Sequence, residues 1–269
     1  MQAWYGLRSA DFAALDAAQT VALLPVAAVE QHGPHLPLGV DAMLLEGILA
    51  AAQPLVPSDP PVLMLPVQAL GHSVEHRAFP GTLTLPPDGL LGLWRALGEG
   101  VARAGVKKLL IFNTHGGNVA AMDIAARELR AAHGLIVYSC SWFNLPLGEA
   151  MDRFGAEELR FGVHGGAVET SMMLALRPDL VRMDRARDFR STSQDRAAAY
   201  PVLGNGRSAK LGWMAQDLNA SGAAGDATQA SAEKGRALIA AAARALADLL
   251  AEISALPLGT VAPGPLDAR

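Results

Sequence analysis

The sequence predicts an α/β protein in which helices cover both faces of a mostly parallel sheet. Short, nearly uninterrupted apolar runs, typical of strands buried on both faces, begin near residues 21, 62, 107 and 135. Longer segments rich in Ala and Leu, which we expect to be helical, separate these runs at residues 42–53, 87–104 and 119–132. Strands that alternate with helices of this length form right-handed β-α-β units in a parallel sheet.

Glycine and proline mark the ends of the expected elements. Pro54 ends the first helix, and Pro87 begins the second, which ends at Gly105. Gly134 is the expected end of the third helix, because glycine readily adopts the left-handed conformation found there. Asn118 precedes that helix and is expected to cap it through its side chain.

The second half of the chain is less regular. Residues 164–171 are rich in glycine and lead into an apolar segment, 172–176, that we expect to be helical. Residues 191–232 are rich in Ser, Ala, Gly and Asp, with Trp213 isolated among them. We expect this segment to form ordered loop and sheet edge.

The C-terminal part returns to a regular pattern. Residues 234–255 predict an Ala- and Leu-rich helix, and the proline- and glycine-rich tail from Pro257 is expected on the surface. The chain has no internal repeat and no linker-like run of charge. Residues 1–269 are therefore predicted to form a single domain.

The composition is that of a well-buried globular protein. Hydrophobic residues make up 51% and charged residues 18% of the chain, and the longest apolar stretches stop short of the roughly 18–20 residues that span a membrane. The net charge of −4 argues against a nucleic-acid or anionic-membrane partner. Cys140 is the only cysteine, and the N-terminus lacks a signal-peptide pattern. We therefore expect a cytoplasmic protein with no membrane and no nucleic-acid partner.

Most of the histidines gather in loops. Of the seven, all except His133 lie in glycine- or proline-rich loops beside predicted strand ends or helix starts: His32, His35, His72, His76, His115 and His164. In an open α/β sheet, ligands bind beyond the carboxyl ends of the strands, so these loops are aimed at one edge. This convergence favours a metal site over independent structural histidines.

The stretch from residue 21 to residue 41 carries the most chemistry. Its apolar run continues into Glu30 and His32, whose side chains share a face in an extended backbone. A carboxylate and an imidazole at the end of a buried strand cost desolvation energy unless a partner such as a divalent ion offsets it. Asp41 follows a proline-rich loop and could bridge two such ions. The alternative is a surface loop with solvated polar residues.

Four residues form the expected ligand set. Glu30, His32, Asp41 and His115 offer two imidazoles and two carboxylates, which suit Zn²⁺, Mn²⁺ or Fe²⁺. The absence of cysteine from this set argues against a structural zinc knuckle. Glu169 is expected to add a further ligand or to act as a catalytic base.

Substrate contacts are expected from the same loops. Gly116 and Gly117 let the backbone approach a ligand closely, and Asn118 follows them directly. His76 lies in the loop after the second strand. We therefore predict that His76, Gly116, Gly117 and Asn118 bind the substrate.

Together these motifs resemble the creatininase (creatinine amidohydrolase) family over nearly the whole chain. The matching stretches are residues 30–41 (EQHGPHLPLGVD), 79–82 (FPGT), 113–118 (NTHGGN), 164–171 (HGGAVETS), 225–226 (GD) and 232–235 (AEKG). The resemblance implies a three-layer α/β/α sandwich and a two-metal site that hydrolyses a C–N bond in a cyclic amide or formamide. It also implies a homo-oligomer, commonly a hexamer.

The resemblance assigns roles by position. Glu30, His32, Asp41 and His115 match family metal ligands, with Asp41 as the bridge between two divalent ions per chain. His164 matches a histidine that serves as a proton shuttle.

One position departs from creatininase itself. That enzyme carries an acidic ligand two residues after the histidine that matches His115, where this chain has Gly117. We expect Glu169 to supply the missing ligand. The aromatic residues that creatininase places around creatinine also lack counterparts near His164, so creatinine is not the expected substrate. The His-Gly-Gly-Asn sequence is more similar to other branches: the deformylase of archaeal flavin and deazaflavin biosynthesis, the peptidase that matures mycofactocin, and a hydrolase of an oxidised inositol.

The sequence therefore predicts a metal-dependent amidohydrolase acting on a small molecule. A metal-bound hydroxide would cleave a C–N bond of a cyclic amide, a formamide or a short peptide, with non-peptide bonds the expected class. A nearby imidazole would protonate the leaving nitrogen. The alternatives are a metal-dependent hydrolase of a cyclic keto-sugar and a non-catalytic, ligand-binding member of the family. His164, retained beside the four ligands, favours the enzyme.

Overall fold

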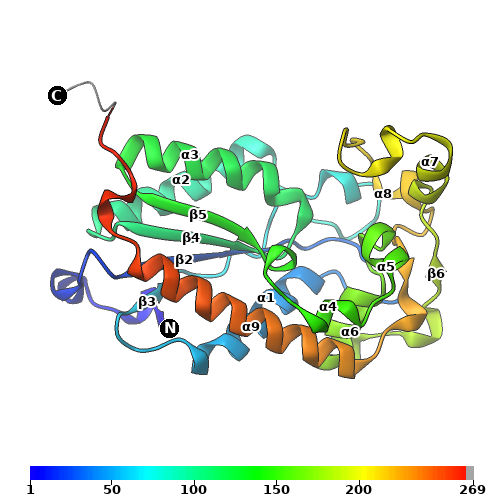
Figure 1. Cartoon of the computed structure of the whole chain (residues 1–269), viewed down its shortest axis with the longest axis horizontal. Coiled ribbons are helices and arrows are strands. Elements are labelled where there is room, and N and C mark those ends of the chain that lie inside the picture. The colour runs from blue at the N-terminus through cyan, green and yellow to red at the C-terminus, as the bar shows by residue number, and fades with distance from the viewer. Residues whose placement is uncertain (265–269) are drawn as a thin grey trace.

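Five parallel strands form the central sheet of the computed structural model, which describes residues 1–264 (Figure 1). Their order across the sheet is β1-β3-β2-β4-β5, and every neighbouring pair is parallel. The strands are β1 (Gln2–Ala3), β2 (Val21–Val26), β3 (Val62–Met64), β4 (Lys108–Asn113) and β5 (Ile136–Ser141). The predicted parallel sheet is confirmed; β1, only two residues long, is too short to give an apolar pattern in the sequence.

Helices cover both faces of the sheet. The α-helices of residues 1–264 are α1 (Val40–Ala52), α2 (Pro87–Arg103), α3 (Val119–His133), α4 (Glu149–Asp152), α5 (Ala156–Phe161), α6 (Ala167–Leu176), α7 (Ser193–Ala199), α8 (Ala215–Leu218) and α9 (Ala232–Ala255). Helices α1, α6 and α9 pack together on one face, and α2 and α3 lie side by side on the other (Figure 1). The three-layer α/β/α architecture is confirmed.

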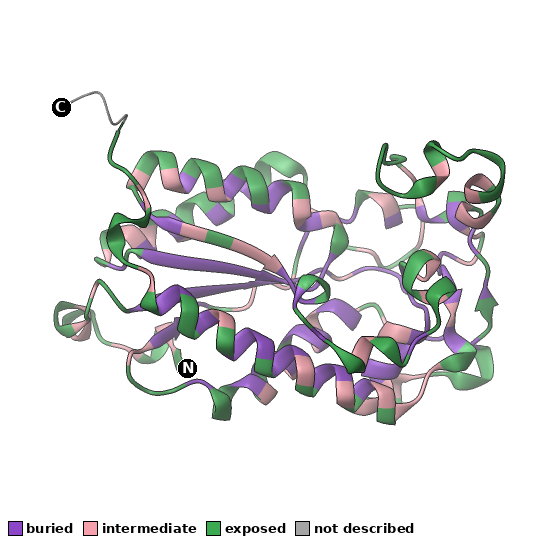
Figure 2. Cartoon of the chain, in the orientation of Figure 1, coloured by how far each residue is buried: buried purple, intermediate pink, exposed green. Residues whose placement is uncertain are grey.

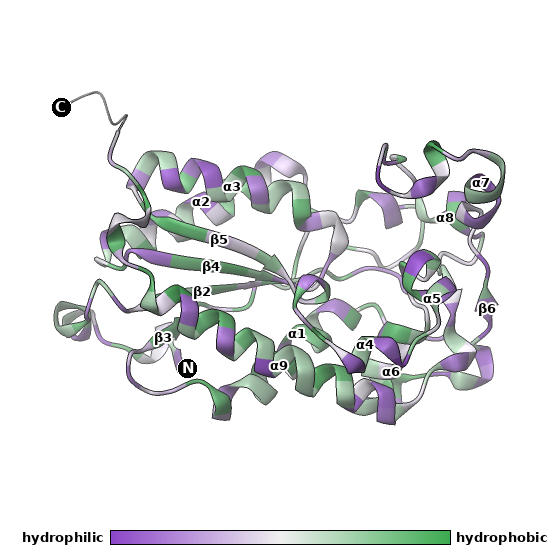
Figure 3. Ribbon diagram, viewed as in Figure 1, coloured by the Kyte–Doolittle hydropathy of each residue, from purple (hydrophilic) through white to green (hydrophobic). Residues whose placement is uncertain are grey.

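Alternate residues of the central strands supply the two hydrophobic cores. Leu23 and Phe112 pack into the core with α1 and α9, whereas Leu24 and Ile111 pack into the core with α2 and α3. Figure 2 shows β2 and β4 buried along their length, and Figure 3 shows them largely hydrophobic. Burial on both faces explains why these strands appear in the sequence as nearly continuous apolar runs.

Most predicted helix boundaries hold to within about two residues, but α6 begins at Ala167, five residues before the predicted segment 172–176. Helix α3 ends where expected, because Gly134 adopts the left-handed conformation at φ 66° and donates its N–H to the Arg130 carbonyl. Asn118 precedes α3 but makes no side-chain cap, so that prediction is wrong. Its amide is used elsewhere in the fold, as described below.

The prediction of ordered loop and sheet edge for residues 191–232 is incomplete, because parts of the segment are helical. This segment contains the short helices α7 and α8, whose lengths of 7 and 4 residues are too small for helical periodicity to show. Its strand β7 (Gly225–Asp226) pairs antiparallel with β6 (Asp188–Phe189) in a separate two-stranded sheet, and so is not an edge of the central sheet.

The C-terminal segment leaves the fold after α9. Residues 257–264 are exposed or partly exposed, as predicted (Figure 2). The remaining residues of the predicted domain, 265–269, lie outside the described part of the chain. Among residues 1–264, no helix is both long enough and apolar enough to cross a membrane.

The topology puts the switch point, where open α/β sheets form their ligand crevice, at the carboxyl ends of β2 and β4. These two strands are neighbours, but the chain leaves β2 through α1 on one face and leaves β4 through α3 on the other. Segments that diverge in this way open a gap beyond the carboxyl ends of the strands, where α/β proteins bind their ligands. Glu30 and His32 follow β2 into this gap, and His115 follows β4.

Candidate metal centre

Five parts of the fold bring seven polar side chains to the crevice. Glu30 and His32 follow β2, Asp41 lies in the first turn of α1, and His115 follows β4. His76 ends a 3₁₀ turn, Val74–His76, in the loop after β3. Two further residues come from the α6 region, His164 before the helix and Glu169 in its first turn. Glu169 retains 18% of its side-chain exposure, and the others are 6% exposed or less.

Among the described residues, four overlapping groups of three donors could each hold an ion, and two of these groups share Asp41. One group comprises Glu30, Asp41 and His115, and the other comprises His32, Asp41 and Glu169. In each group the potential ligand atoms lie within 4.8 Å of one another. Asp41 Oδ2 lies 3.5 Å from His115 Nδ1, and Asp41 Oδ1 lies 3.7 Å from His32 Nε2. Its two oxygens therefore face one imidazole each.

Three atoms at this centre are buried without a hydrogen-bond partner within residues 1–264. They are Glu30 Oε2, His32 Nε2 and Asp41 Oδ2. Buried polar atoms without a partner are rare, because each carries an uncompensated desolvation cost. Two carboxylate oxygens and an imidazole nitrogen are donor types that suit a divalent transition ion.

Hydrogen bonds fix which ring nitrogen of each histidine faces the centre. His32 Nδ1–H donates to the Glu30 carbonyl at 3.0 Å, which leaves the Nε2 lone pair pointing at Asp41. His115 Nε2–H donates to the His72 carbonyl at 2.9 Å, which leaves its Nδ1 lone pair pointing at Glu30 and Asp41. A backbone carbonyl behind the ring is the usual way to orient a metal-binding histidine.

The buried carboxylates of the cluster favour positive charge on or beside them. Burial disfavours a charged Glu30, yet neighbouring imidazoles, His115 foremost, hold its pKa far below its usual range. Burial also opposes a charge on His32 and His115, but carboxylates outweigh it: Asp41 raises the pKa of His32 to about 9, and Glu30 raises that of His115 to about 10. Burial and the Glu30 charge raise the pKa of Asp41 to about 6. Without a metal, protons on the imidazoles supply the positive charge that divalent ions would otherwise bring.

Glu169 does not provide the main cap of α6. The Glu158 carboxylate, from α5, accepts the Ala167 N–H at 2.5 Å through Oε1 and the Asp226 N–H at 2.8 Å through Oε2. Glu169 instead accepts the Gly165 N–H at 2.6 Å through its own Oε2, and this atom lies 4.0 Å from His32 Nε2. The carboxylate is thus held in place by the loop before α6 and faces the cluster.

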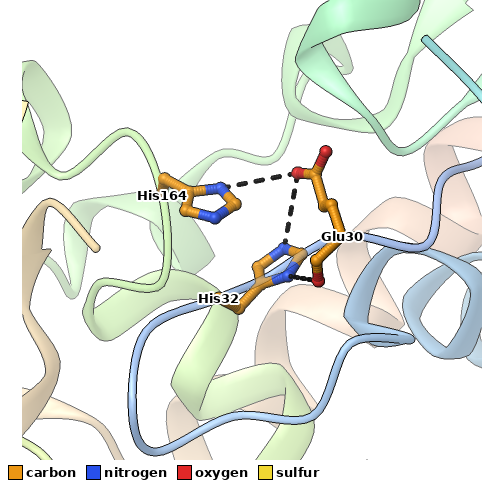
Figure 4. Close-up of side chains that lie close together, drawn as sticks. All are labelled: Glu30, His32 and His164. Atoms are coloured by element: carbon orange, nitrogen blue, oxygen red, sulfur yellow. Dashed lines mark hydrogen bonds and ion pairs between the residues drawn. The ribbon is translucent and has the colours of Figure 1, made fainter. Parts of the chain in front are cut away.

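Three imidazoles stack beside the donor groups. The His164 ring lies between those of His32 and His76, with centroid distances of 4.2 and 4.1 Å. Figure 4 shows His164 and His32 converging on the Glu30 carboxylate, which lies 3.6 Å from His164 Nδ1. Burial, reinforced by His32, lowers the pKa of His164 to about 4, and burial, reinforced by His164, lowers that of His76 to about 2. Both rings are therefore neutral near pH 7.

The family model for creatininase, described as creatinine amidohydrolase, matches residues 6–250. The chain belongs to the creatininase family. It is 31% identical to the mycofactocin precursor peptide peptidase of Mycobacterium ulcerans over 81% of this chain and 79% of that protein. It is 30% identical to the creatinine amidohydrolase of Pseudomonas putida over 88% of this chain and 90% of that protein. A solved structure described as "Creatininase Mn" superposes with a TM-score of 0.72 at 28% identity, over 93% of this chain and 97% of that one.

The creatininase-family motifs account for the clustered residues. Glu30, His32, Asp41, His115, His164 and Glu169 all meet at the crevice. His35, from the same first motif, lies apart: its Nε2 contacts Thr170 Oγ1 at 2.9 Å, and its ring stacks on Phe189.

The residues predicted to bind the substrate are divided by the structure. His76 lies in the cluster, with Nε2 3.4 Å from Glu30 Oε1. Gly116, which directly follows His115 in the chain, is exposed. Asn118 is completely buried, and its amide is fully engaged: Oδ1 accepts the His72 N–H, and Nδ2 donates to the Ala27 carbonyl and to Asn113. Asn118 therefore ties β2, β4 and the loop after β3 together beneath the crevice.

Gly117, the position that departs from creatininase, has no room for a side chain. A Cβ there would lie 2.5 Å from Glu75 Oε1 and 2.5 Å from His115 Nε2. Glu75 precedes His76, and its Oε1 lies 3.8 Å from His115 Nε2. Gly117 thus allows the loop after β3 to lie directly against His115.

Sequence reasoning missed Gln31, Glu75 and Glu158. Gln31 lies between two expected ligands and is 5% exposed, so its position inside the first motif was the available signal. Glu75 adjoins the predicted His76, and this adjacent acid-histidine pair could have drawn attention to it. Glu158 gives no such signal, because its partners Ala167 and Asp226 become its neighbours only through folding.

Proposed function

We propose that this member of the creatininase family is a metal-dependent amidohydrolase with two divalent ions per chain. The observation that carries the proposal is the Asp41 carboxylate, which is shared by two of the donor groups while its Oδ2 has no hydrogen-bond partner in residues 1–264. Zn²⁺, Mn²⁺ and Fe²⁺ all suit a set of carboxylates and imidazoles.

The residues divide into ligands and proton carriers. Glu30, Asp41 and His115 would hold one ion, and His32, Asp41 and Glu169 the other. When bound, such ions polarise a carbonyl and lower the pKa of a water molecule. His164 lies beside them with a neutral ring, and it would take a proton from the attacking water and pass it to the leaving nitrogen.

The substrate we propose is an amide other than creatinine. Creatinine amidohydrolase and the mycofactocin precursor peptide peptidase, both relatives of this chain, are named for substrates with C–N bonds. The space at Gly117 is taken by Glu75 and His115, so the acidic ligand of creatininase has no equivalent at this position. This difference supports a cyclic amide, a formamide or a short peptide as the substrate class, with non-peptide bonds favoured.

The homo-oligomer suggested by the family resemblance stays part of the proposal. Light scattering of the purified protein tests it, and a mass equal to one chain would contradict it.

A substrate screen with metal-reconstituted protein tests the function. Protein loaded with Mn²⁺ or Zn²⁺ is incubated with cyclic amides, formamides, short peptides, creatinine and cyclic keto-sugars, and release of amine or acid is measured. We expect turnover of at least one amide, with creatinine a poor substrate, and loss of about 10²–10⁴-fold in His164→Ala. Turnover of a keto-sugar but of no amide would identify the protein as a keto-sugar hydrolase instead. Full activity of the metal-free protein would refute the proposal.

A further inference from the structure

The Gln31 side chain contacts His76 and His164, two of the three stacked histidines, at the ring nitrogens that do not face Glu30. It follows Glu30 in an extended segment and is nearly completely buried. Its Oε1 accepts the Gly33 N–H at 2.8 Å. Because an N–H can only donate, this bond fixes which end of the amide is oxygen and leaves Nε2 as a donor of two protons.

Both protons of the Gln31 amide have acceptors. Nε2 donates to the Gly222 carbonyl at 2.8 Å and to His76 Nδ1 at 2.7 Å. A ring nitrogen that accepts a hydrogen bond carries no proton, so the proton of neutral His76 lies on Nε2. That Nε2–H points into the crevice, 3.4 Å from Glu30 Oε1.

The Gln31 backbone fixes the second ring. His164 Nε2 lies 2.6 Å from the Gln31 carbonyl, and a carbonyl can only accept, so His164 carries its proton on Nε2. Its Nδ1 therefore presents a lone pair to the crevice, 3.6 Å from Glu30 Oε1. The 3.3 Å contact between Gln31 Nε2 and His164 Nε2 then joins two N–H groups and is not a hydrogen bond.

We propose that Gln31 is a positioning residue that gives His76 and His164 opposite proton roles at the metal centre. Both rings are Nε2–H tautomers, but they are turned so that His76 presents an N–H donor and His164 presents an acceptor nitrogen. The tautomers follow from the hydrogen bonds of two neutral rings, whereas their catalytic meaning rests on the proposed amidohydrolase function.

The two roles complement each other in amide hydrolysis. His164 Nδ1 takes a proton as the water oxygen bonds to the carbonyl carbon, and it returns that proton to the nitrogen as the C–N bond breaks. His76 Nε2–H donates a hydrogen bond to the oxygen on which negative charge develops, and it keeps its proton throughout. No oxidant or further reactant is needed, because the products contain the atoms of the amide and one water.

Nitrogen NMR of the full chain reads the tautomers directly. Protein labelled with ¹⁵N-histidine and loaded with Zn²⁺ is examined by magic-angle-spinning NMR, which distinguishes protonated from unprotonated ring nitrogens. His76→Gln and His164→Gln identify the two residues among the seven histidines. In the unaltered chain we expect an unprotonated Nδ1 and a protonated Nε2 for both; a protonated Nδ1 on His76 would overturn the proposal.

Gln31→Glu tests the cause. A carboxylate at this position accepts a hydrogen bond from His76 instead of donating one, so Nδ1 of His76 should become protonated. Gln53→Glu adds the same charge at an exposed position and should leave the His76 signals unchanged. If Gln31→Glu does not fold, Gln31→Met removes the donor without adding charge, and the His76 signals should then split between two tautomers. An unchanged single Nε2–H tautomer in the variant that folds refutes the role of Gln31.

Kinetics separate this proposal from the function on which its meaning rests. With the substrate found in the screen, Gln31→Met should lower kcat by about 10²-fold, as for a lost donor to a developing charge. In a His76→Gln background the same change should have little further effect, because the side chain acts through His76. If the two substitutions lower kcat independently, so that their fold-losses multiply, the positioning role of Gln31 is refuted. Protein that hydrolyses no amide would defeat the proposed function alone, and the tautomers would still be decided by NMR.

Discussion

The carboxylate of Glu75 occupies the space into which a side chain at Gly117 would extend. An ideal Cβ on Gly117 lies 2.5 Å from Glu75 Oε1, and the His72 carbonyl lies closer still. The same carbonyl accepts the N–H of His115 and thereby turns the other ring nitrogen toward Glu30 and Asp41. Glycine at this position therefore protects the orientation of a candidate metal ligand.

Gly117→Ala should weaken metal binding while the adjacent Gly116→Ala does not. The added methyl group must displace Glu75 or the His72 carbonyl, and loss of the carbonyl frees the His115 ring. Changes behind a metal-binding histidine typically cost about 10–100-fold in affinity. At Gly116 a Cβ meets nothing within 4 Å, so that variant controls for the substitution. Zinc titration against a competing chelator measures both affinities, and equal affinities would contradict the prediction.

Asp41→Asn should reduce both ions, whereas His32→Ala should reduce mainly one. Asp41 is shared by the Glu30–Asp41–His115 group and the His32–Asp41–Glu169 group, and an amide oxygen is a neutral, weaker ligand. Asp123→Asn, on the exposed face of α3, makes the same chemical change away from the site. Elemental analysis should give about two ions per chain in the control, about one in His32→Ala and fewer in Asp41→Asn. Loss of one ion in both site variants would indicate a mononuclear centre.

Much of the fold follows from local patterns in the sequence. Strands β2 and β4 are predictable because burial on both faces demands apolar residues at every position. Gly134 marks the end of α3, because glycine readily adopts the left-handed backbone found there, and this preference can be recognised from the single residue. Helices α7 and α8 and the β6–β7 pair are not predictable in this way, since each is too short to show a period.

The candidate site likewise contains residues that local sequence patterns predict and residues that they do not. Glu30, His32 and His115 directly follow predicted strands, so parallel topology alone brings them together. Gln31 is different, because its side chain meets His76 and Gly222, residues 45 and 191 positions away, through loops without regular structure. Tautomers depend on such long-range hydrogen bonds, and the sequence indicates which histidines gather without indicating where their protons lie.

Glu169→Gln should lower metal occupancy and leave the fold intact. The amide oxygen of glutamine can still accept the Gly165 N–H, and Glu158 continues to cap α6, so the start of the helix is preserved. The ligand facing His32 loses its charge. Glu233→Gln is the matched control, since Glu233 also lies in the first turn of a helix but is exposed. Full occupancy with unchanged melting temperature in Glu169→Gln would leave Glu169 only the hydrogen bond to the loop.

Metal-free protein should lose stability as the pH rises from 7 to 10.5, and zinc-loaded protein should lose much less. Carboxylates raise the folded-state pKa of His32 to about 9 and of His115 to about 10, above the value of about 6.5 for an unfolded chain. Because the folded state holds these protons more tightly, their contribution is complete below pH 6.5 and disappears as the pH rises through 9 and 10. We expect the melting temperature of the metal-free form to fall clearly across this range, because a loss of free energy of unfolding lowers the melting temperature. In the loaded form the imidazoles are neutral ligands, so their titration is removed and only the remaining groups contribute. Melting curves of both forms at matched pH measure the difference, and parallel losses would show that the imidazole protons do not stabilise the metal-free cluster.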